Sequence, residues 1–104
     1  MKIISATELN SLLKDPEFLL IDIREHYERE ICSIKSLHIT MEDISEKIDK
    51  IPMEKQICIL CKTGKRASAV ANLLETDFNY KDVMVVDGGL VAYKEQVDPS
   101  LEIY

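Results

Sequence analysis

The chain has 104 residues, carries a formal net charge of −6 and is 46% hydrophobic. A chain of this size buries roughly two-thirds of the surface that its unfolded form exposes, so we expect one domain over residues 1–104, without a disulfide framework or a structural metal. The acidic balance argues against a nucleic-acid binder, which needs a basic face to contact phosphates. The longest apolar runs have strand length and fall short of the ~20 residues of a membrane helix, so we expect no membrane segment.

The N-terminus and the cysteines indicate the compartment. Residues 1–8 include polar and acidic residues where a signal peptide would have its apolar core, so we expect a cytoplasmic protein. The chain has three cysteines, Cys32, Cys58 and Cys61. In a reducing compartment each of them is assessed for reactivity rather than for a disulfide partner.

The first half of the chain alternates short apolar runs with helix-like segments. After an extended run at 2–4, the tetrapeptide Ser5–Glu8 fits a capping box and predicts a helix that ends before Pro16. The near-continuous apolar run Phe18–Ile23 predicts a strand buried on both faces. A short polar helix is expected near His26–Glu30.

The middle of the chain predicts a brief strand and a second helix. The strand is expected at Ser36–Ile39 and the helix start at Thr40–Asp43, with Pro52 as the stop. The predicted buried face of this helix consists of Ile44, Ile48 and Ile51.

The second half predicts two further units of a strand followed by a helix. The strands are expected at Gln56–Cys61 and Val83–Val86, and the helices at Ala67–Thr76 and Leu90–Val97. Alternation of this kind is typical of an α/β fold with about five mostly parallel strands and helices on both faces.

Cys61 is the candidate nucleophile, because it ends a predicted strand immediately before a loop and a helix. In open parallel sheets the active site lies beyond the carboxyl ends of the strands. Backbone N–H groups of the loop, the dipole of the following helix and the basic side chains all favour the thiolate over the thiol. Gly64 is placed where a positive φ would let the backbone curl around the sulfur. The predicted binding loop consists of Lys62, Thr63, Gly64, Lys65 and Arg66.

Alternative roles for the cysteines are weaker. Cys61 could be a buried strand-end residue beside a coincidentally basic loop. Cys58 forms a C-x-x-C with Cys61, but it lies inside the predicted strand with its side chain directed away from the loop, so we expect a small core residue rather than a redox partner. No second cysteine pair or histidine pair completes a zinc site, so we expect no metal. We expect Cys32 either to pack in the core or to be partly exposed without a chemical role.

The other chemistry-bearing residues are charged groups and two histidines. Asp22, Arg24 and Glu25 lie at the end of a neighbouring strand, and they either border the same crevice or form an internal ion pair at the junction of strand and helix. His26 or His38 would serve a Cys–His enzyme only if the fold brought one of them to Cys61.

These motifs resemble the rhodanese family, whose cysteine carries sulfane sulfur as a persulfide. The similarity rests on three motifs in the family's order, which are Leu20–Glu25, Cys61–Ala67 and Val86–Tyr93. Ala67 stands where Ser is usual in the family, and Tyr93 stands where Trp is usual. The resemblance implies a rhodanese-like fold, Cys61 as the sulfur carrier and no cofactor.

Loop length distinguishes two chemistries within this resemblance. Cys61 and Arg66 enclose four residues, whereas the related dual-specificity phosphatases use one more residue to hold a tetrahedral phosphate. The shorter loop favours sulfur. The rival from another class is a non-catalytic module of rhodanese fold that binds a regulatory partner; such modules commonly lose the nucleophile, whereas Cys61 is retained.

The tail Tyr93–Tyr104 resembles the end of rhodanese domains fused to the adenylating enzymes of molybdopterin and thiamine synthesis. This similarity implies a small sulfur-carrier protein as acceptor and a cysteine desulfurase persulfide as donor, and it implies that the chain is a piece of a longer protein. The alternative is a stand-alone domain that takes sulfur from thiosulfate and serves small thiols.

Overall fold

The computed structural model describes residues 1–103 as strands and helices in alternation. Tyr104, the last residue of the tail discussed above, lies outside the described residues. In chain order the elements are β1 (Lys2–Ile4), α1 (Ala6–Leu12), β2 (Phe18–Asp22), α2 (His26–Ile31), β3 (Leu37–His38), the 3-10 helices η1 (Met41–Asp43) and η2 (Ile48–Lys50), β4 (Gln56–Leu60), α3 (Lys65–Asp77), β5 (Met84–Val86) and α4 (Gly89–Gln96).

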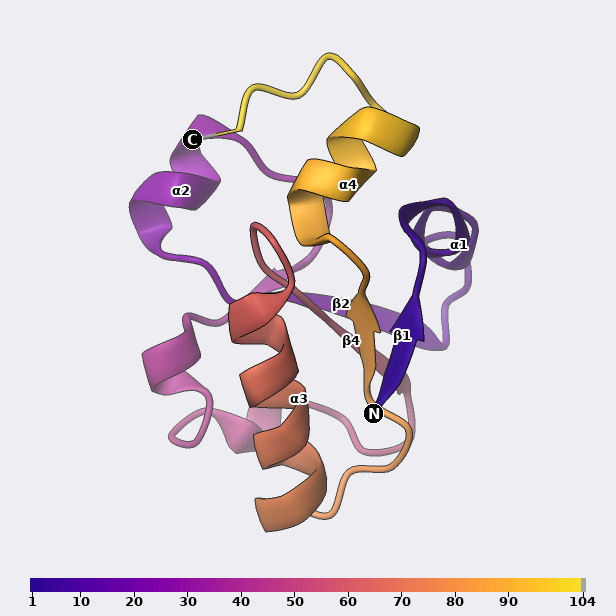
Figure 1. The fold of residues 1–104 in the computed structure, drawn as a ribbon. Helices are drawn as coiled ribbons and strands as arrows, with labels where there is room; N and C mark the ends of the chain where they lie inside the picture. The colour runs from indigo at the N-terminus through magenta and orange to yellow at the C-terminus, as the bar shows by residue number, and fades with distance from the viewer. Residues whose placement is uncertain (104) are drawn as a thin grey trace.

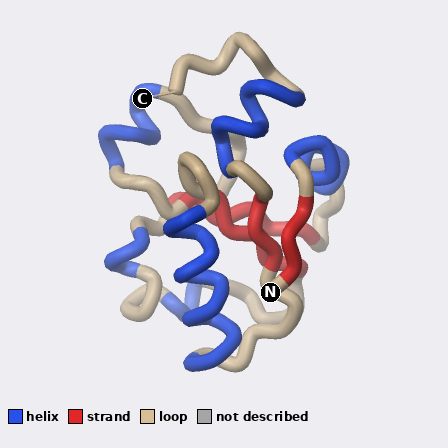
Figure 2. Tube along the Cα trace, viewed as in Figure 1, coloured by secondary structure: helices blue, strands red, loops and turns tan. Residues whose placement is uncertain are grey.

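The five strands form one sheet in the order β1-β5-β4-β2-β3, and every neighbouring pair is parallel. In Figure 1, α3 and the two 3-10 helices lie on one side of this sheet, and α1 and α4 lie on the other. Figure 2 shows the same arrangement as a layer of strands between layers of helices. The predicted parallel α/β fold with helices on both faces is confirmed.

The central strand β4 supplies side chains alternately to two apolar clusters. Ile57 and Ile59 pack with α3 on one face, while Cys58 and Leu60 pack with α1 and α4 on the other. Successive side chains of a strand point to opposite faces, so a strand covered on both faces must be apolar throughout. This requirement explains why the run Gln56–Cys61 was readable from sequence as a buried strand.

The capping box at the start of α1 is confirmed. The Glu8 N–H donates to Ser5 Oγ at 3.0 Å, and the Ser5 N–H donates to Glu8 Oε1 at 3.2 Å. The two bonds satisfy N–H groups that the first turn of a helix leaves without partners.

The helix predicted from Thr40–Asp43 is wrong, because this segment forms the short 3-10 helices η1 and η2 instead. The Thr40 side chain makes no capping bond, and its Oγ1 is buried without a partner among the described residues. The β-branched isoleucines of the segment are only fair helix formers. Packing of Ile44 and Ile51 into the core therefore decides the path of the chain.

Candidate active site

Cys61 follows the last residue of β4, at the carboxyl edge of the sheet, and is 1% exposed. Its neighbours across the sheet are the ends of β2 and β5, which are the strands that flank β4. The predicted position at a strand end before a helix is therefore confirmed.

Two backbone N–H groups point at the sulfur of Cys61. The Gly64 N–H lies 3.1 Å from Sγ and the Ala67 N–H lies 3.3 Å from it. Gly64 has a φ of 101°, a left-handed conformation that L side chains rarely adopt, and it caps the 13-residue helix α3. The loop thus curls around the sulfur as predicted, and the donors and the helix dipole both favour negative charge on the sulfur.

The first residues of α4 bind the backbone of this loop. The N–H groups of Leu90 and Val91 donate to the carbonyl oxygens of Cys61 and Lys62 at 2.9 and 3.1 Å. A Cβ placed on Gly89 would lie 2.5 Å from the Cys61 carbonyl oxygen, so only glycine permits this approach. The Asp87-Gly88-Gly89 turn therefore supports the Cys61 loop through its backbone.

Arg66 is paired with an acid that the sequence did not single out. Its guanidinium donates to both carboxylate oxygens of Glu28 in α2, at 2.7 and 2.9 Å. This pairing lowers the pKa of the Glu28 carboxyl and raises the pKa of Arg66. The hydrogen bond from the Glu25 N–H also lowers the pKa of Glu28. The positive field predicted from Lys62, Lys65 and Arg66 together is reduced accordingly, because Glu28 balances one of the three charges.

Glu28 could have been noticed only as part of a local motif. It lies three residues after Glu25 and accepts a hydrogen bond from the Glu25 N–H at 3.1 Å, which completes a capping box for α2. Its contact with Arg66 spans 38 positions along the chain, so that contact depends on the tertiary fold.

Asp22 and Arg24 form an internal ion pair. Arg24 donates through Nε and Nη2 to the Asp22 carboxylate, and Nη2 also donates to the Cys32 carbonyl at 2.7 Å. The two residues are 0% and 1% exposed, so they do not contribute to the charged rim that was one of the two expectations for them. Glu25, the third member of the set, is exposed.

The two histidines lie against each other, with ring centroids 4.8 Å apart in an edge-to-face arrangement. A ring nitrogen of His38, Nε2, lies 2.7 Å from the Arg24 carbonyl oxygen. Within residues 1–103 no hydrogen bond joins either ring to Cys61. This arrangement gives the Cys–His hypothesis no support.

Cys58 and Cys61 face opposite sides of the sheet. Burial raises the pKa of the Cys58 thiol to about 12, so Cys58 is a neutral core residue at physiological pH. Cys32 is 8% exposed and packs in the same cluster as Cys58. The prediction that the C-x-x-C is not a redox pair agrees with this geometry, since side chains on opposite faces of a strand cannot form a disulfide.

A family model described as "Rhodanese-like domain" matches residues 5–96. The parallel sheet and the cysteine loop are thus those of a known class of α/β domain. The chain belongs to the rhodanese-like domain family.

Similar proteins differ in length and architecture. The chain is 36% identical to the rhodanese-like/PpiC domain-containing protein 12, chloroplastic, of Arabidopsis thaliana, over 100% of this chain and 38% of that protein. It is 28% identical to the adenylyltransferase and sulfurtransferase UBA4 of Kluyveromyces lactis, over 88% of this chain and 23% of that protein. It is 33% identical to the putative sulfurtransferase YtwF of Bacillus subtilis, over 96% of this chain and 97% of that protein. The chain therefore spans less than two-fifths of the length of each of the first two relatives, and nearly all of the third.

Solved structures support the same fold. A rhodanese-related protein from Thermoplasma volcanium aligns with a TM-score of 0.84 and 26% identity, over 98% of this chain and 100% of that one. The resemblance to rhodanese domains, including those of adenylating enzymes, is confirmed by these matches. Relatives named as sulfurtransferases support sulfur transfer as the class of reaction.

No helix within residues 1–103 is long and apolar enough to cross a membrane.

Proposed function

We propose that this protein is a rhodanese-type sulfurtransferase that carries sulfane sulfur as a persulfide on Cys61. The observation that supports this proposal most strongly is the pair of N–H groups, from Gly64 and Ala67, directed at the Cys61 sulfur. Donors fixed before the reaction stabilise developing negative charge without reorganisation. They favour the attacking thiolate and also the persulfide anion that replaces it.

In the first half-reaction the Cys61 thiolate attacks the outer sulfur of thiosulfate. A new S–S bond forms to Cys61, the bond between the two sulfur atoms of thiosulfate breaks, and its electron pair leaves with sulfite. Cys61 is 1% exposed, which favours donors that present a terminal sulfur over bulky groups. The N–H groups of Gly64 and Ala67, which point toward this site, then stabilise the charge of the persulfide.

In the second half-reaction an acceptor attacks the outer sulfur. Cyanide forms a bond to it, the S–S bond breaks, thiocyanate leaves and the Cys61 thiolate is restored. A thiol acceptor becomes a persulfide by the same displacement. The exposed loop residues Thr63 and Lys65 are the side chains that such an acceptor meets, while Lys62 and Arg66 are half-buried beside them.

The physiological donor and acceptor are proposed from the similarity to UBA4, whose name couples adenylyl transfer with sulfur transfer. We infer a cysteine desulfurase persulfide as donor and a small sulfur-carrier protein with an adenylated C-terminus as acceptor, in molybdopterin or thiamine biosynthesis. A cytoplasmic location fits these partners. Neither a metal nor an organic cofactor is required, because a thiolate and an anion-stabilising loop suffice for both half-reactions.

Incubation with thiosulfate followed by intact-protein mass spectrometry tests the proposal. We expect a gain of one sulfur atom on the native chain and its loss as thiocyanate after cyanide is added. Cys61→Ser abolishes both events, whereas the matched control Cys58→Ala, which alters the other cysteine of the same strand, retains them. If neither thiosulfate nor a persulfidated cysteine desulfurase modifies Cys61 in the folded native chain, the protein is a binding module rather than an enzyme.

A further inference from the structure

The outer edge of β2 is only partly covered by a neighbouring strand. β3 has two residues, which pair with Ile21 and Asp22, while Phe18, Leu19 and Leu20 pair with β4 on the inner side and have no β3 partner. An unpaired strand edge presents N–H and C=O groups that can bind another extended chain.

The polar groups on this edge belong to two residues. The Asp22 carbonyl accepts from the Ile39 N–H on the β3 side, and groups two residues apart along a strand point in the same direction. The groups of Phe18 and Leu20 therefore face outward as well. The Phe18 N–H is already bound to the Asp15 carbonyl at 3.1 Å. Strand β3 begins at Leu37, opposite Ile21, so it starts too late in the chain to reach the Phe18 C=O or the Leu20 N–H.

The Phe18 C=O and the Leu20 N–H have no hydrogen-bond partner within residues 1–103, and together they select one direction of pairing. In a parallel pair, a residue of the incoming strand lies opposite one residue of the receiving strand. Its N–H donates to the C=O of the residue before that one, and its C=O accepts from the N–H of the residue after it. The Phe18 C=O and the Leu20 N–H flank Leu19 in this way. An antiparallel partner would instead need both the N–H and the C=O of one residue, and the N–H of Phe18 is occupied.

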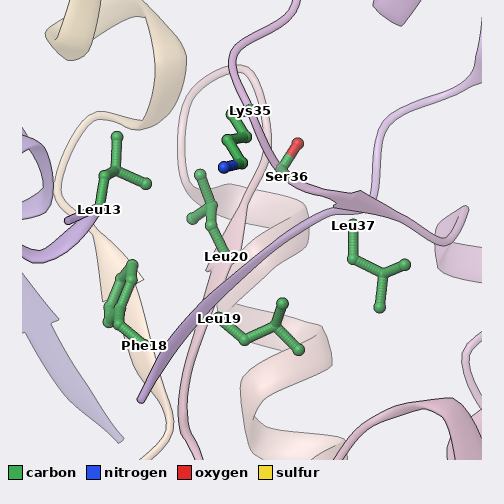
Figure 3. A pocket seen from close by; sticks show the side chains of 7 residues that line it. All are labelled: Leu13, Phe18, Leu19, Leu20, Lys35, Ser36 and Leu37. Carbon is green, nitrogen blue, oxygen red and sulfur yellow. The ribbon is translucent and has the colours of Figure 1, made fainter. Parts of the chain in front are cut away.

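A pocket of about 170 Å³ lies along the same edge, lined by Leu13, Phe18, Leu19, Leu20, Lys35, Ser36 and Leu37. Phe18 and Leu20 belong to one face of the sheet with Leu13, and Leu19 and Leu37 belong to the other. Figure 3 shows the Lys35 side chain directed toward Leu20, with Leu19 and Leu37 on the other side. Lys35 is exposed, and no acid pairs with it within residues 1–103.

We propose that this edge, the Phe18–Leu20 edge, binds an extended peptide segment of another protein, parallel to β2. The segment carries two consecutive apolar residues, one for each face of the sheet, and an acidic residue for Lys35. The proposal is independent of sulfur transfer, because none of the lining residues belongs to the Cys61 loop.

Hydrogen exchange followed by NMR tests the free edge. In the protein alone we expect the Leu20 amide to exchange faster than those of Leu19 and Ile21, which face β4. Addition of the peptide acetyl-Ser-Glu-Val-Leu-Thr-Ser-amide should slow exchange at Leu20 and shift resonances of the pocket residues, with a dissociation constant on the order of 0.1–1 mM for so small a contact. A Leu20 amide that is already as protected as its neighbours overturns the proposal.

N-methylation of the peptide distinguishes strand pairing from apolar adhesion. Alternate N–H groups of a bound strand face away from the protein. Of two peptides that are methylated once, at the Val nitrogen or at the Leu nitrogen, only one should therefore bind about tenfold more weakly. Equal effects of the two methyl groups contradict the proposal.

The charge of Lys35 is tested by reversal. Lys35→Glu should weaken binding of the acidic peptide roughly two- to fivefold. The same variant should favour binding of a peptide with Lys in place of Glu. The control Lys81→Glu alters an exposed lysine before β5 and should leave binding unchanged, and both variants should keep native persulfide loading. Absence of saturable peptide binding overturns the proposal. Protection of the Leu20 amide that rises with protein concentration, without peptide, also overturns it and assigns the edge to another copy of this chain.

Discussion

Glu28 and Arg66 illustrate how one pair of side chains connects two elements at the site. Glu28 lies in α2 and Arg66 in the first turn of α3, and their two-point contact fixes the guanidinium beside the Cys61 loop. Arg66 is about one-third exposed and Glu28 is nearly buried, so the pair has a moderate energetic value.

Removal of the Glu28 charge should reduce stability and change its pH dependence. Because the folded-state pKa of Glu28 is lowered from 4.5, its stabilising contribution is fully present above about pH 4.5 and is lost as the pH falls through the folded-state value. Glu28→Gln should lower the free energy of unfolding at pH 7 by about 1–2 kcal/mol and make the decline below pH 4.5 shallower. Urea unfolding at pH 3–7 measures both effects.

The control for this experiment is Glu30→Gln, which changes an exposed carboxylate of the same helix. It should leave the acid-side slope of the native chain unchanged. Equal slopes for the native chain and Glu28→Gln would show that the pair makes no pH-dependent contribution.

The Asp22–Arg24 pair should contribute to stability and not to sulfur loading. Asp22→Asn leaves the buried Arg24 guanidinium without its counter-charge, and we expect a loss of about 3–5 kcal/mol in the free energy of unfolding. The exposed-site control Asp49→Asn should cost less than ~0.5 kcal/mol. Persulfide loading per folded molecule should stay native in both variants; a selective loss in Asp22→Asn would assign Asp22 to the site.

At the scale of elements, the contact between α4 and the Cys61 loop maintains the shape of that loop. The first N–H groups of α4 bind the loop carbonyls, so a helix start serves as a support. Backbone approach this close requires glycine at position 89, where the φ is also positive at 58°.

Gly89→Ala should therefore damage the loop. The added Cβ would meet the carbonyl oxygens of Cys61 and Lys62, and the left-handed backbone adds strain of about 1–3 kcal/mol. We expect lower stability, measured by thermal unfolding, and slower persulfide formation in the molecules that remain folded. Val91→Ala keeps the N–H that binds Lys62, so its loading rate should stay close to native; equal rates in the two variants would argue against the support role.

At the scale of the whole molecule, the sheet divides the core into two clusters. Cys61 packs on the α3 side, whereas Cys32 and Cys58 pack on the side of α1 and α4. The Cα radius of gyration is 12.5 Å, close to the value expected for a folded chain of this length. Access to the Cys58 thiol, which is 0% exposed and lies inside β4, therefore depends on opening of this compact core.

Thiol labelling should follow this division. In native buffer at pH 8 a small alkylating reagent should modify Cys61 before Cys58, because Cys61 lies in the loop beyond the end of β4 whereas Cys58 lies inside the strand. Cys58 has a pKa of about 12 and should react only through global unfolding, at a rate that rises with urea in parallel with the unfolded fraction. Peptide mapping by mass spectrometry gives the order, and labelling of Cys58 before Cys61 in the absence of urea would contradict it.

Much of the fold and the position of Cys61 could be predicted from the sequence because they depend on local patterns. Apolar runs, the Ser5–Glu8 capping box and the loop between β4 and α3 involve residues close together in the chain. The alternation of strands and helices then restricts the fold to a parallel sheet, since parallel strands need helical crossovers. The direction of Cys58 away from the loop also follows from the two-residue period of a strand.

Tertiary structure alone decided the contacts between distant residues. Glu28 and Arg66 are 38 positions apart, the Asp22–Arg24 pair is internal because other elements cover it, and the segment after Thr40 follows the core rather than a helical period. The open Phe18–Leu20 edge exists because β3, the last strand in the sheet order, begins only opposite Ile21. Local propensity describes what a segment prefers, whereas burial and pairing depend on which segments the complete fold brings together.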